Sequence, residues 1–180
     1  MKLVLAGGSS HSDSYVDSLR RHESDQIRFL PWVSGSNLEE LLSNAALFVL
    51  PSELEGLSLA LLDAMAADVC VLTSDIPENN EVVQGTGFTF HRGDQADLER
   101  MLDLLIHDPG LRRRAAVRQR ERIQTEYLWP VIAHSVEAAY YKVLDWSPNE
   151  LTPGEPFLTT LALENAPGSS LGRLTGNCRP

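Results

Sequence analysis

Residues 47–73 read LFVLPSELEGLSLALLDAMAADVCVLT. Two short segments of this stretch, residues 47–50 and 69–72, are apolar at every position. Such segments are typical of strands that are buried on both faces of a parallel sheet. Between them lie a polar loop at 51–58 and a nearly all-apolar helical pattern. A strand, a loop, a helix and a second strand in this order predict a βαβ unit with a right-handed crossover.

The same alternation continues toward both ends of the chain. Strands are expected at residues 2–6, 27–30, 47–50, 69–73 and 88–90. Helices are expected at residues 13–22, 38–45, 59–67, 95–107 and 111–126, and from Pro130 onward. Asn37, with Glu40 three residues later, resembles a capping box. The order of elements predicts an α/β fold with a doubly wound parallel sheet and helices at the C-terminal end.

The composition changes near residue 147. Residues 1–146 carry the alternating pattern and are expected to form one domain. Residues 147–180 are rich in proline, glycine, serine and threonine, and their composition predicts a disordered tail.

Charge and residue usage exclude several classes of protein. With 15 Lys+Arg against 25 Asp+Glu, the net charge of -10 disfavours nucleic acid as a partner. Lys2 and Lys142 are the only lysines, so the chain lacks the Gly-Lys-Ser/Thr of a P-loop. Cys70 and Cys178 are far apart and form neither a metal-ligand cluster nor a disulfide framework. No secretory signal or apolar run of ~18 residues is seen, so a cytoplasmic location is expected.

The loop at 51–58 is the candidate ligand site. Ligands of open parallel sheets bind beyond the carboxyl ends of the strands, where Glu55 is expected to lie. Gly56 would let the backbone approach a ligand closely. The amides of Leu57, Ser58 and Leu59 are expected at the start of the next helix, where free N–H groups favour a phosphate.

Asp63 is unusual within this apolar helical pattern. Its helical neighbours three and four positions away are leucine and alanines, so no cation on the same helix can pair with it. If its carboxylate is buried, it must find hydrogen-bond donors, and two hydroxyls of a ribose would match it. The alternative is that Asp63 bonds to backbone groups or to a distant arginine, and the spacing alone leaves both possibilities open.

Residues 51–67 resemble the Glu-x7-Glu signature of group 1 glycosyltransferases, which have the GT-B fold. The resemblance extends over residues 2–144, and further matching pieces lie at 2–8, 27–33, 73–83, 86–88 and 93–94. It implies a Rossmann-like donor-binding domain, the C-terminal half of a GT-B enzyme. Such enzymes transfer a sugar from a nucleotide-diphosphate sugar, and the resemblance implies no metal and no other cofactor.

The resemblance also implies which residues contact the nucleotide-sugar. The implied donor-binding positions are Gly7, Pro31, Trp32, Val33, Glu55, Gly56, Leu57, Ser58, Leu59 and Asp63. Glu55 would face the donor sugar as the catalytic residue, and the amides that follow it would hold the sugar and the diphosphate. Asp63 would bind the ribose hydroxyls, and the loop around Trp32 would hold the base. Trp32 could stack on the base or could be a core residue, and its sequence context fits both.

The chain departs from the family pattern in three respects. The second acidic residue is Asp63 rather than glutamate, and Ser58 replaces the usual proline or glycine. The family's first strand, with its phosphate-binding loop, has no counterpart in the 180 residues. The N-terminal acceptor domain also has no counterpart, so a missing domain or a partner chain is expected to supply it.

Two alternatives accompany the expected transferase, which would be a retaining enzyme. The chain could be a non-catalytic remnant that binds a nucleotide-sugar or contacts a partner, and a flavodoxin-like binding domain has less support. Six arginines lie close together on the expected helix 111–126: Arg112, Arg113, Arg114, Arg118, Arg120 and Arg122. They could form a solvated helix face or a peripheral contact with an anionic membrane.

Overall fold

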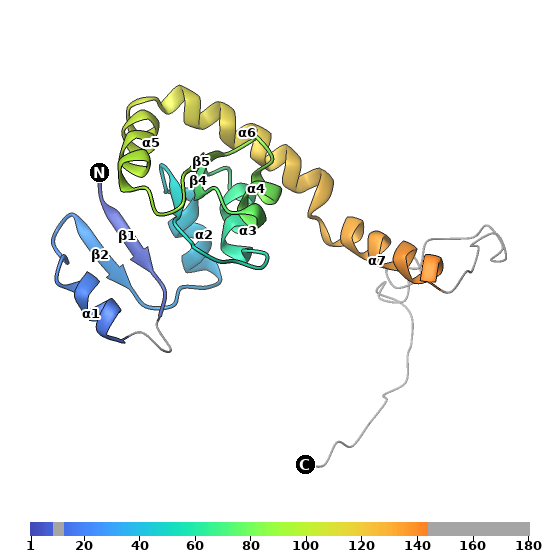
Figure 1. Cartoon of the computed structure of the whole chain (residues 1–180), viewed down its shortest axis with the longest axis horizontal. Helices are drawn as coiled ribbons and strands as arrows, with labels where there is room; N and C mark the ends of the chain where they lie inside the picture. The colour runs from blue at the N-terminus through green and yellow to red at the C-terminus, as the bar shows by residue number, and fades with distance from the viewer. Residues whose placement is uncertain (9–12, 144–180) are drawn as a thin grey trace, which may run out of the picture. The chain divides into compact units, whose positions relative to one another are not determined.

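The computed structural model describes residues 1–8 and 13–143 (Figure 1). The chain divides into two compact units, Met1–Thr125 and Glu126–Pro180, and each is described separately. The expected tail at 147–180 lies outside the described residues.

All of the expected strands form. They are β1 (Leu3–Ala6), β2 (Ile27–Leu30), β3 (Phe48–Leu50), β4 (Val71–Ser74) and β5 (Phe88–Phe90). Each lies within a residue or two of the position predicted from its apolar run. The pairs β1–β2, β3–β4 and β4–β5 are all parallel, which confirms the α/β class.

The helices follow the expected pattern, with one addition. They are α1 (Asp13–Arg20), α2 (Ser36–Ser43), α3 (Leu59–Ala66), α4 (Pro77–Val83), α5 (Gln95–His107), α6 (Pro109–Glu126) and α7 (Trp129–Val143). α4 was not expected from the sequence, although Pro77 at its first position is a recognised start signal. None of the helices in the described part of the chain is long and apolar enough to span a bilayer.

The predicted capping box at the start of α2 is wrong. The helix begins at Ser36, so Asn37 lies inside its first turn, and no side chain caps it. Gly35 is the N-cap, with a φ of 60°, and its carbonyl accepts the amides of Leu38 and Glu39 at 3.0 and 3.1 Å. The positive φ explains why glycine occupies this position.

The strands form two sheets rather than one continuous sheet. β1 and β2 make a two-stranded sheet, and β3, β4 and β5 make a three-stranded sheet with β4 in the centre (Figure 1). The register pairs Leu3 with Ile27 in the first sheet and Phe48 with Val71 in the second. Within the described residues, β1 and β3 therefore each have only one hydrogen-bonded neighbour.

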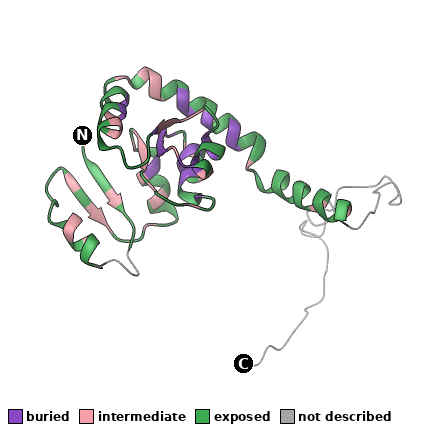
Figure 2. Ribbon diagram, in the orientation of Figure 1, coloured by how far each residue is buried: buried purple, intermediate pink, exposed green. Residues whose placement is uncertain are grey.

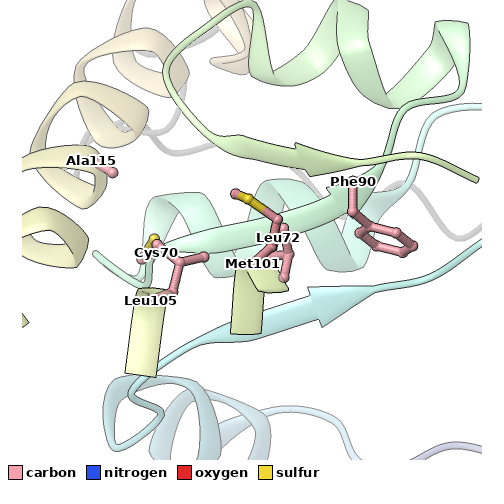
Figure 3. Packing of buried hydrophobic residues seen from close by; sticks show 6 residues of the cluster. All are labelled: Cys70, Leu72, Phe90, Met101, Leu105 and Ala115. Carbon is pink, nitrogen blue, oxygen red and sulfur yellow. The ribbon is translucent and has the colours of Figure 1, made fainter. Parts of the chain in front are cut away.

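The hydrophobic core lies around the second sheet. Every residue of β4 is buried, as expected for a strand with a neighbour on each side. One cluster joins β4 and β5 to α5 and α6 (Figure 3). Its buried members are Cys70, Leu72, Phe90, Met101, Leu105 and Ala115. Burial raises the pKa of the Cys70 thiol to about 11, which disfavours the reactive thiolate, and the side chain packs in this cluster.

The first sheet is much less buried than the second (Figure 2). β1 has the apolar sequence LVLA, yet Leu3 and Val4 are 54% and 38% exposed. In the second unit, α7 buries none of its described residues.

Candidate functional site

The site is built around the loop that connects β3 to α3. Glu55 lies in this loop, beyond the carboxyl end of β3, and is half-buried. The hydroxyl of Ser52 donates a hydrogen bond of 2.5 Å to Oε1 of Glu55. A short bond from a hydroxyl to a carboxylate is a strong one, so Glu55 is held in one orientation.

A series of hydrogen bonds from β4 and α4 holds this loop in place. The Oγ of Ser74, at the end of β4, donates to the carbonyl of Ser52 at 2.5 Å. The side-chain amide of Asn79, on α4, donates to Ser74 Oγ at 3.2 Å and to its carbonyl at 3.3 Å. Ser74 and Asn79 are each 1% exposed. Buried hydrogen-bonded groups of this kind favour a single conformation, which here is the conformation of the loop carrying Glu55.

A second cluster lies where β4 and β5 end. The carboxylate of Asp75 lies 2.7 Å from Nδ1 of His91, within hydrogen-bond distance. It also accepts a hydrogen bond of 2.8 Å from the backbone N–H of Arg92. These hydrogen bonds lower the pKa of Asp75, and the bond from Arg92 has the largest effect. The Asp75 carboxylate in turn raises the pKa of His91. The guanidinium of Arg92 reaches the carbonyl of Glu53 at 3.4 Å. The cluster therefore places a cation beside the loop that carries Glu55.

α3 begins at Leu59, the last of the three residues whose amides were expected at the start of the helix. Ser58 is the N-cap, and its carbonyl accepts the first helical bond from Leu62 at 3.2 Å. The unpaired first-turn amides of α3 are thus those from Leu59 onward, while Leu57 and Ser58 precede the helix. A Cβ added at Gly56 would meet nothing within 4 Å, so there is open space at this position.

Asp63 is exposed, so the condition considered from the sequence, a buried carboxylate in need of donors, does not apply. The buried face of α3 consists of Leu61, Ala64 and Met65. Asp63 lies on the other face, four residues after Leu59, which is itself exposed. The solvated carboxylate therefore needs no partner within the protein and is free to meet a ligand on this helix face.

The remaining predicted positions follow the strands of the first sheet. Gly7 follows β1, and its N–H donates to the carbonyl of Leu30 at the end of β2 at 3.2 Å. Pro31 and Trp32 come next after β2, and both are exposed, whereas Val33 is half-buried. Trp32 is 79% exposed, so it is not a core residue. The structure brings Gly7 and the Pro31–Val33 loop together, and it brings Glu55 close to the cluster after β4 and β5.

Sequence reasoning gave no role to Ser52, Ser74, Asp75, Asn79, His91 or Arg92. The available signal was that all but Asn79 lie at or just after the ends of β3, β4 and β5, because the carboxyl ends of parallel strands meet at one edge of a sheet. Their hydrogen-bond partners could not be identified from spacing, because they lie up to 39 residues apart in the chain.

The arginines of α6 do not form a uniform solvated face. Arg122 is buried and donates to the carbonyls of Val82 and Glu81 at 2.7 and 3.0 Å. Arg112 donates to the carbonyls of Leu105 and Ile106 near the end of α5, and Arg120 pairs with Asp68. Arg113, Arg114 and Arg118 are exposed. Contact with an anionic membrane stays a prediction.

An open groove of about 760 Å³ lies at the opposite edge of the second sheet from Glu55. It is lined by residues that precede β3 and β4, including Ala46 and Cys70, and by α6 from Pro109 to Gln124. No cluster of three His, Cys, Asp or Glu suited to a metal ion occurs in residues 1–8 and 13–143.

Comparison with known proteins identifies the family. The sequence profile described as glycosyl transferases group 1 matches residues 1–122. Alpha-maltose-1-phosphate synthase of Mycobacterium tuberculosis H37Rv is 31% identical over 158 residues, covering 79% of this chain and 41% of the synthase. The chain thus spans less than half the length of the curated relatives that it matches.

Solved structures show the same fold. Sucrose-phosphate synthase from Thermosynechococcus elongatus matches with a TM-score of 0.71 and 25% identity, covering 80% of this chain and 39% of that one. HepE from Anabaena, solved in complex with UDP-glucose, matches with a TM-score of 0.62 and 18% identity, covering 68% and 36%.

Proposed function

Because the chain belongs to the group 1 glycosyl transferase family, we propose that it is the donor-binding half of a retaining glycosyltransferase that uses a nucleotide-diphosphate sugar. The observation that carries the proposal is the position of Glu55. Its carboxylate is half-buried beyond the carboxyl end of β3, fixed by Ser52, and lies shortly before the start of α3. This is the edge of a parallel sheet at which nucleotides bind.

Each part of the donor has a proposed contact. Glu55 orients the transferred sugar, and the diphosphate lies at the first amides of α3, where the helix dipole favours negative charge. Arg92, beside the loop, adds positive charge that stabilises the diphosphate leaving group. Asp63 accepts hydroxyls of the ribose, and exposed Trp32 stacks on the base. In this proposal amides and cations, rather than a metal ion, balance the diphosphate charge.

The likeness to HepE supports a uridine nucleotide as the first donor to test, since that protein shares the fold and was solved with UDP-glucose. The relatives' names also point to sugar polymer and sugar phosphate synthesis, as for the alpha-maltose-1-phosphate synthase. The acceptor would be bound by a separate domain, supplied by further polypeptide or by a partner chain.

Titration calorimetry with UDP, ADP, UDP-glucose and ADP-glucose tests the site. Asp63→Asn should weaken both the free nucleotide and the nucleotide-sugar, by about 1.5–3 kcal/mol if charge-assisted bonds are lost. Glu55→Gln should weaken only the nucleotide-sugar. Glu53→Gln is the matched control, because Glu53 is an exposed glutamate of the same loop. Equal loss of free nucleotide in Glu55→Gln and Asp63→Asn would contradict the division of roles.

Two observations favour a second candidate, a nucleotide-sugar-binding or partner-contacting module without activity of its own. The match covers only 41% of the length of the M. tuberculosis synthase, and the strands in the described part of the chain form two separate sheets. Transfer of labelled glucose by the chain together with an acceptor domain, and its absence in Glu55→Gln, would support the enzyme. Nucleotide binding without transfer in that mixture would support the module.

A further inference from the structure

The open groove at the opposite edge of the second sheet from Glu55 takes no part in the proposed donor site. Its volume of about 760 Å³ is in the range of small-molecule binding sites. One wall is α6 from Pro109 to Gln124, and the other is formed by two alanines before β3 and by Asp68 and Cys70 before β4. All of these residues belong to the unit Met1–Thr125, so the groove is formed within one compact unit.

Small side chains form the floor of the groove. Cys70 and Ala116 are 2% and 6% exposed, and Ala45 is half-buried. Val117, which also lines the groove, is 52% exposed although it is apolar. A ligand with an apolar or ring-shaped body would fit over these small side chains and would remove apolar surface from water.

Three arginines of α6 line the groove, and they differ in how they are held. Arg112 Nη1 donates to two carbonyls at the end of α5, which leaves the Nε and Nη2 donors of its guanidinium for other partners. Arg120 pairs with Asp68. Arg113 is exposed and makes no hydrogen bond or ion pair with any other residue that the structure describes. Two adjacent guanidiniums with unused donors therefore lie toward the N-terminal end of α6.

The acidic residues do not neutralise this end of the groove. Asp68 is already paired with an arginine, and Glu121 lies eight residues after Arg113, about 12 Å farther along the helix axis. Asp108, at the start of α6, accepts a backbone amide of the first turn at 2.7 Å. On a chain with a net charge of -10, positive charge is thus concentrated at Arg112 and Arg113.

The titration of Cys70 indicates that this charge acts on the floor of the groove. Burial raises the pKa of the thiol to about 11, and the charges of Arg112 and Arg118 act in the opposite direction. Cations that favour a thiolate at this position would favour any other anion placed there.

We propose that this groove is a second ligand site, which binds a small phosphate monoester with its phosphate at Arg112 and Arg113 and its apolar or ring-shaped body over the floor. Guanidinium forks bind phosphate oxygens in pairs, and a phosphate dianion gains more from two adjacent cations than a carboxylate does. The site lies apart from the proposed donor site, because the residues that precede β3 and β4 are at the opposite edge of the sheet from Glu55.

NMR titration with phenyl phosphate tests the proposal, because this probe joins a phosphate monoester to an apolar ring. We expect the amide signals of Ala46, Cys70 and Val117 to shift and to saturate together. Phenol, which lacks the charged group, should bind at least about tenfold more weakly. Inorganic phosphate, which lacks the ring, should bind at least about fivefold more weakly.

Arg113→Gln and Arg114→Gln are a matched pair of variants. The two arginines are exposed neighbours on α6 with the same charge, but only Arg113 lines the groove. Arg113→Gln should weaken binding of phenyl phosphate about tenfold, because a charge-assisted hydrogen bond is lost. Arg114→Gln should change it less than about twofold at physiological salt, because its charge is screened by solvent. Thermal unfolding of both variants checks that the fold is intact, as expected for exposed side chains.

Four results would overturn the proposal. They are the absence of saturable shifts at the groove amides, equal loss of affinity in the two variants, phenol binding as tightly as phenyl phosphate, and inorganic phosphate binding as tightly as the ester. Equal loss in the two variants would indicate a general attraction of anions to α6. The signals lie at the opposite edge of the sheet from Glu55, so this site can fail while the proposed donor site stands, and the reverse also holds.

Discussion

The hydroxyl of Ser52 lies 2.5 Å from Oε1 of Glu55, and the carbonyl of the same serine accepts a hydrogen bond from Ser74. Ser52 therefore connects the carboxylate proposed to face the donor sugar to the buried end of β4. Through this residue, the packing of the second sheet determines the orientation of Glu55.

Ser52→Ala should weaken binding of UDP-glucose and leave UDP binding unchanged. The substitution removes the donor to Glu55 but no group proposed to touch the nucleotide, and one hydrogen bond to a charged group is worth about 1.5–3 kcal/mol. Calorimetry with both ligands measures the difference. Ser43→Ala is the control, since Ser43 donates only to the carbonyl of Glu40 on the surface of α2. Loss of UDP affinity in Ser52→Ala would show that the serine serves the loop as a whole.

Asn79→Ala should lower the free energy of unfolding by about 1–3 kcal/mol, because it leaves the buried Ser74 without its amide donor. Asn80→Ala is matched to it. Asn80 is the next residue of α4, is exposed and donates to the carbonyl of Asp75 at 2.9 Å. Urea unfolding should show a clearly smaller loss for Asn80→Ala, and equal losses would contradict the importance of the buried bonds.

Gly87→Ala should destabilise the protein by about 1–3 kcal/mol through overpacking. A Cβ at this position would lie 3.0 Å from Val71 Cγ2, Val83 Cγ1 and Gln119 Nε2. Gly56→Ala is the matched control, because a Cβ there has open space, and it should leave the melting temperature unchanged. Gly56→Ala should nevertheless weaken nucleotide binding if the diphosphate approaches the backbone at this position, and calorimetry would detect the loss.

The Asp75–His91 pair should make a pH-dependent contribution to stability. The raised pKa of His91 means that its contribution is full below its unfolded pKa of about 6.5 and is lost as pH rises through the folded pKa. The lowered pKa of Asp75 means that its contribution is present above about 3.8 and is lost as pH falls through the folded value. The pair therefore stabilises the cluster most between about pH 4 and 6.5.

NMR titration of the His91 ring measures this effect directly. In Asp75→Asn the pKa of His91 should fall toward its ordinary value of 6.5, because the carboxylate that raises it is gone. An unchanged His91 titration in this variant would show that the ion pair does not persist in solution.

Local patterns predicted the parallel strands and most of the helices, because apolar periodicity depends on neighbouring residues. The capping box at Asn37 was wrong, because Gly35 supplies a backbone conformation that ends the loop earlier. The sequence left the burial of Asp63 open. Its apolar neighbours could not settle it, because α3 packs only one face, and which face is covered depends on distant elements.

By itself the sequence determined the α/β class, the family, and the position of Glu55 in a loop between a buried strand and a helix. These follow from local periodicity and from a motif within 17 residues. Only the tertiary structure decided which side chains hold Glu55, because Ser52 and Ser74 are 22 residues apart and Arg92 lies 39 residues from Glu53. It also decided that β1 and β3 each pair with only one strand of the described residues, since pairing between strands depends on which strands meet and not on the composition of any one of them.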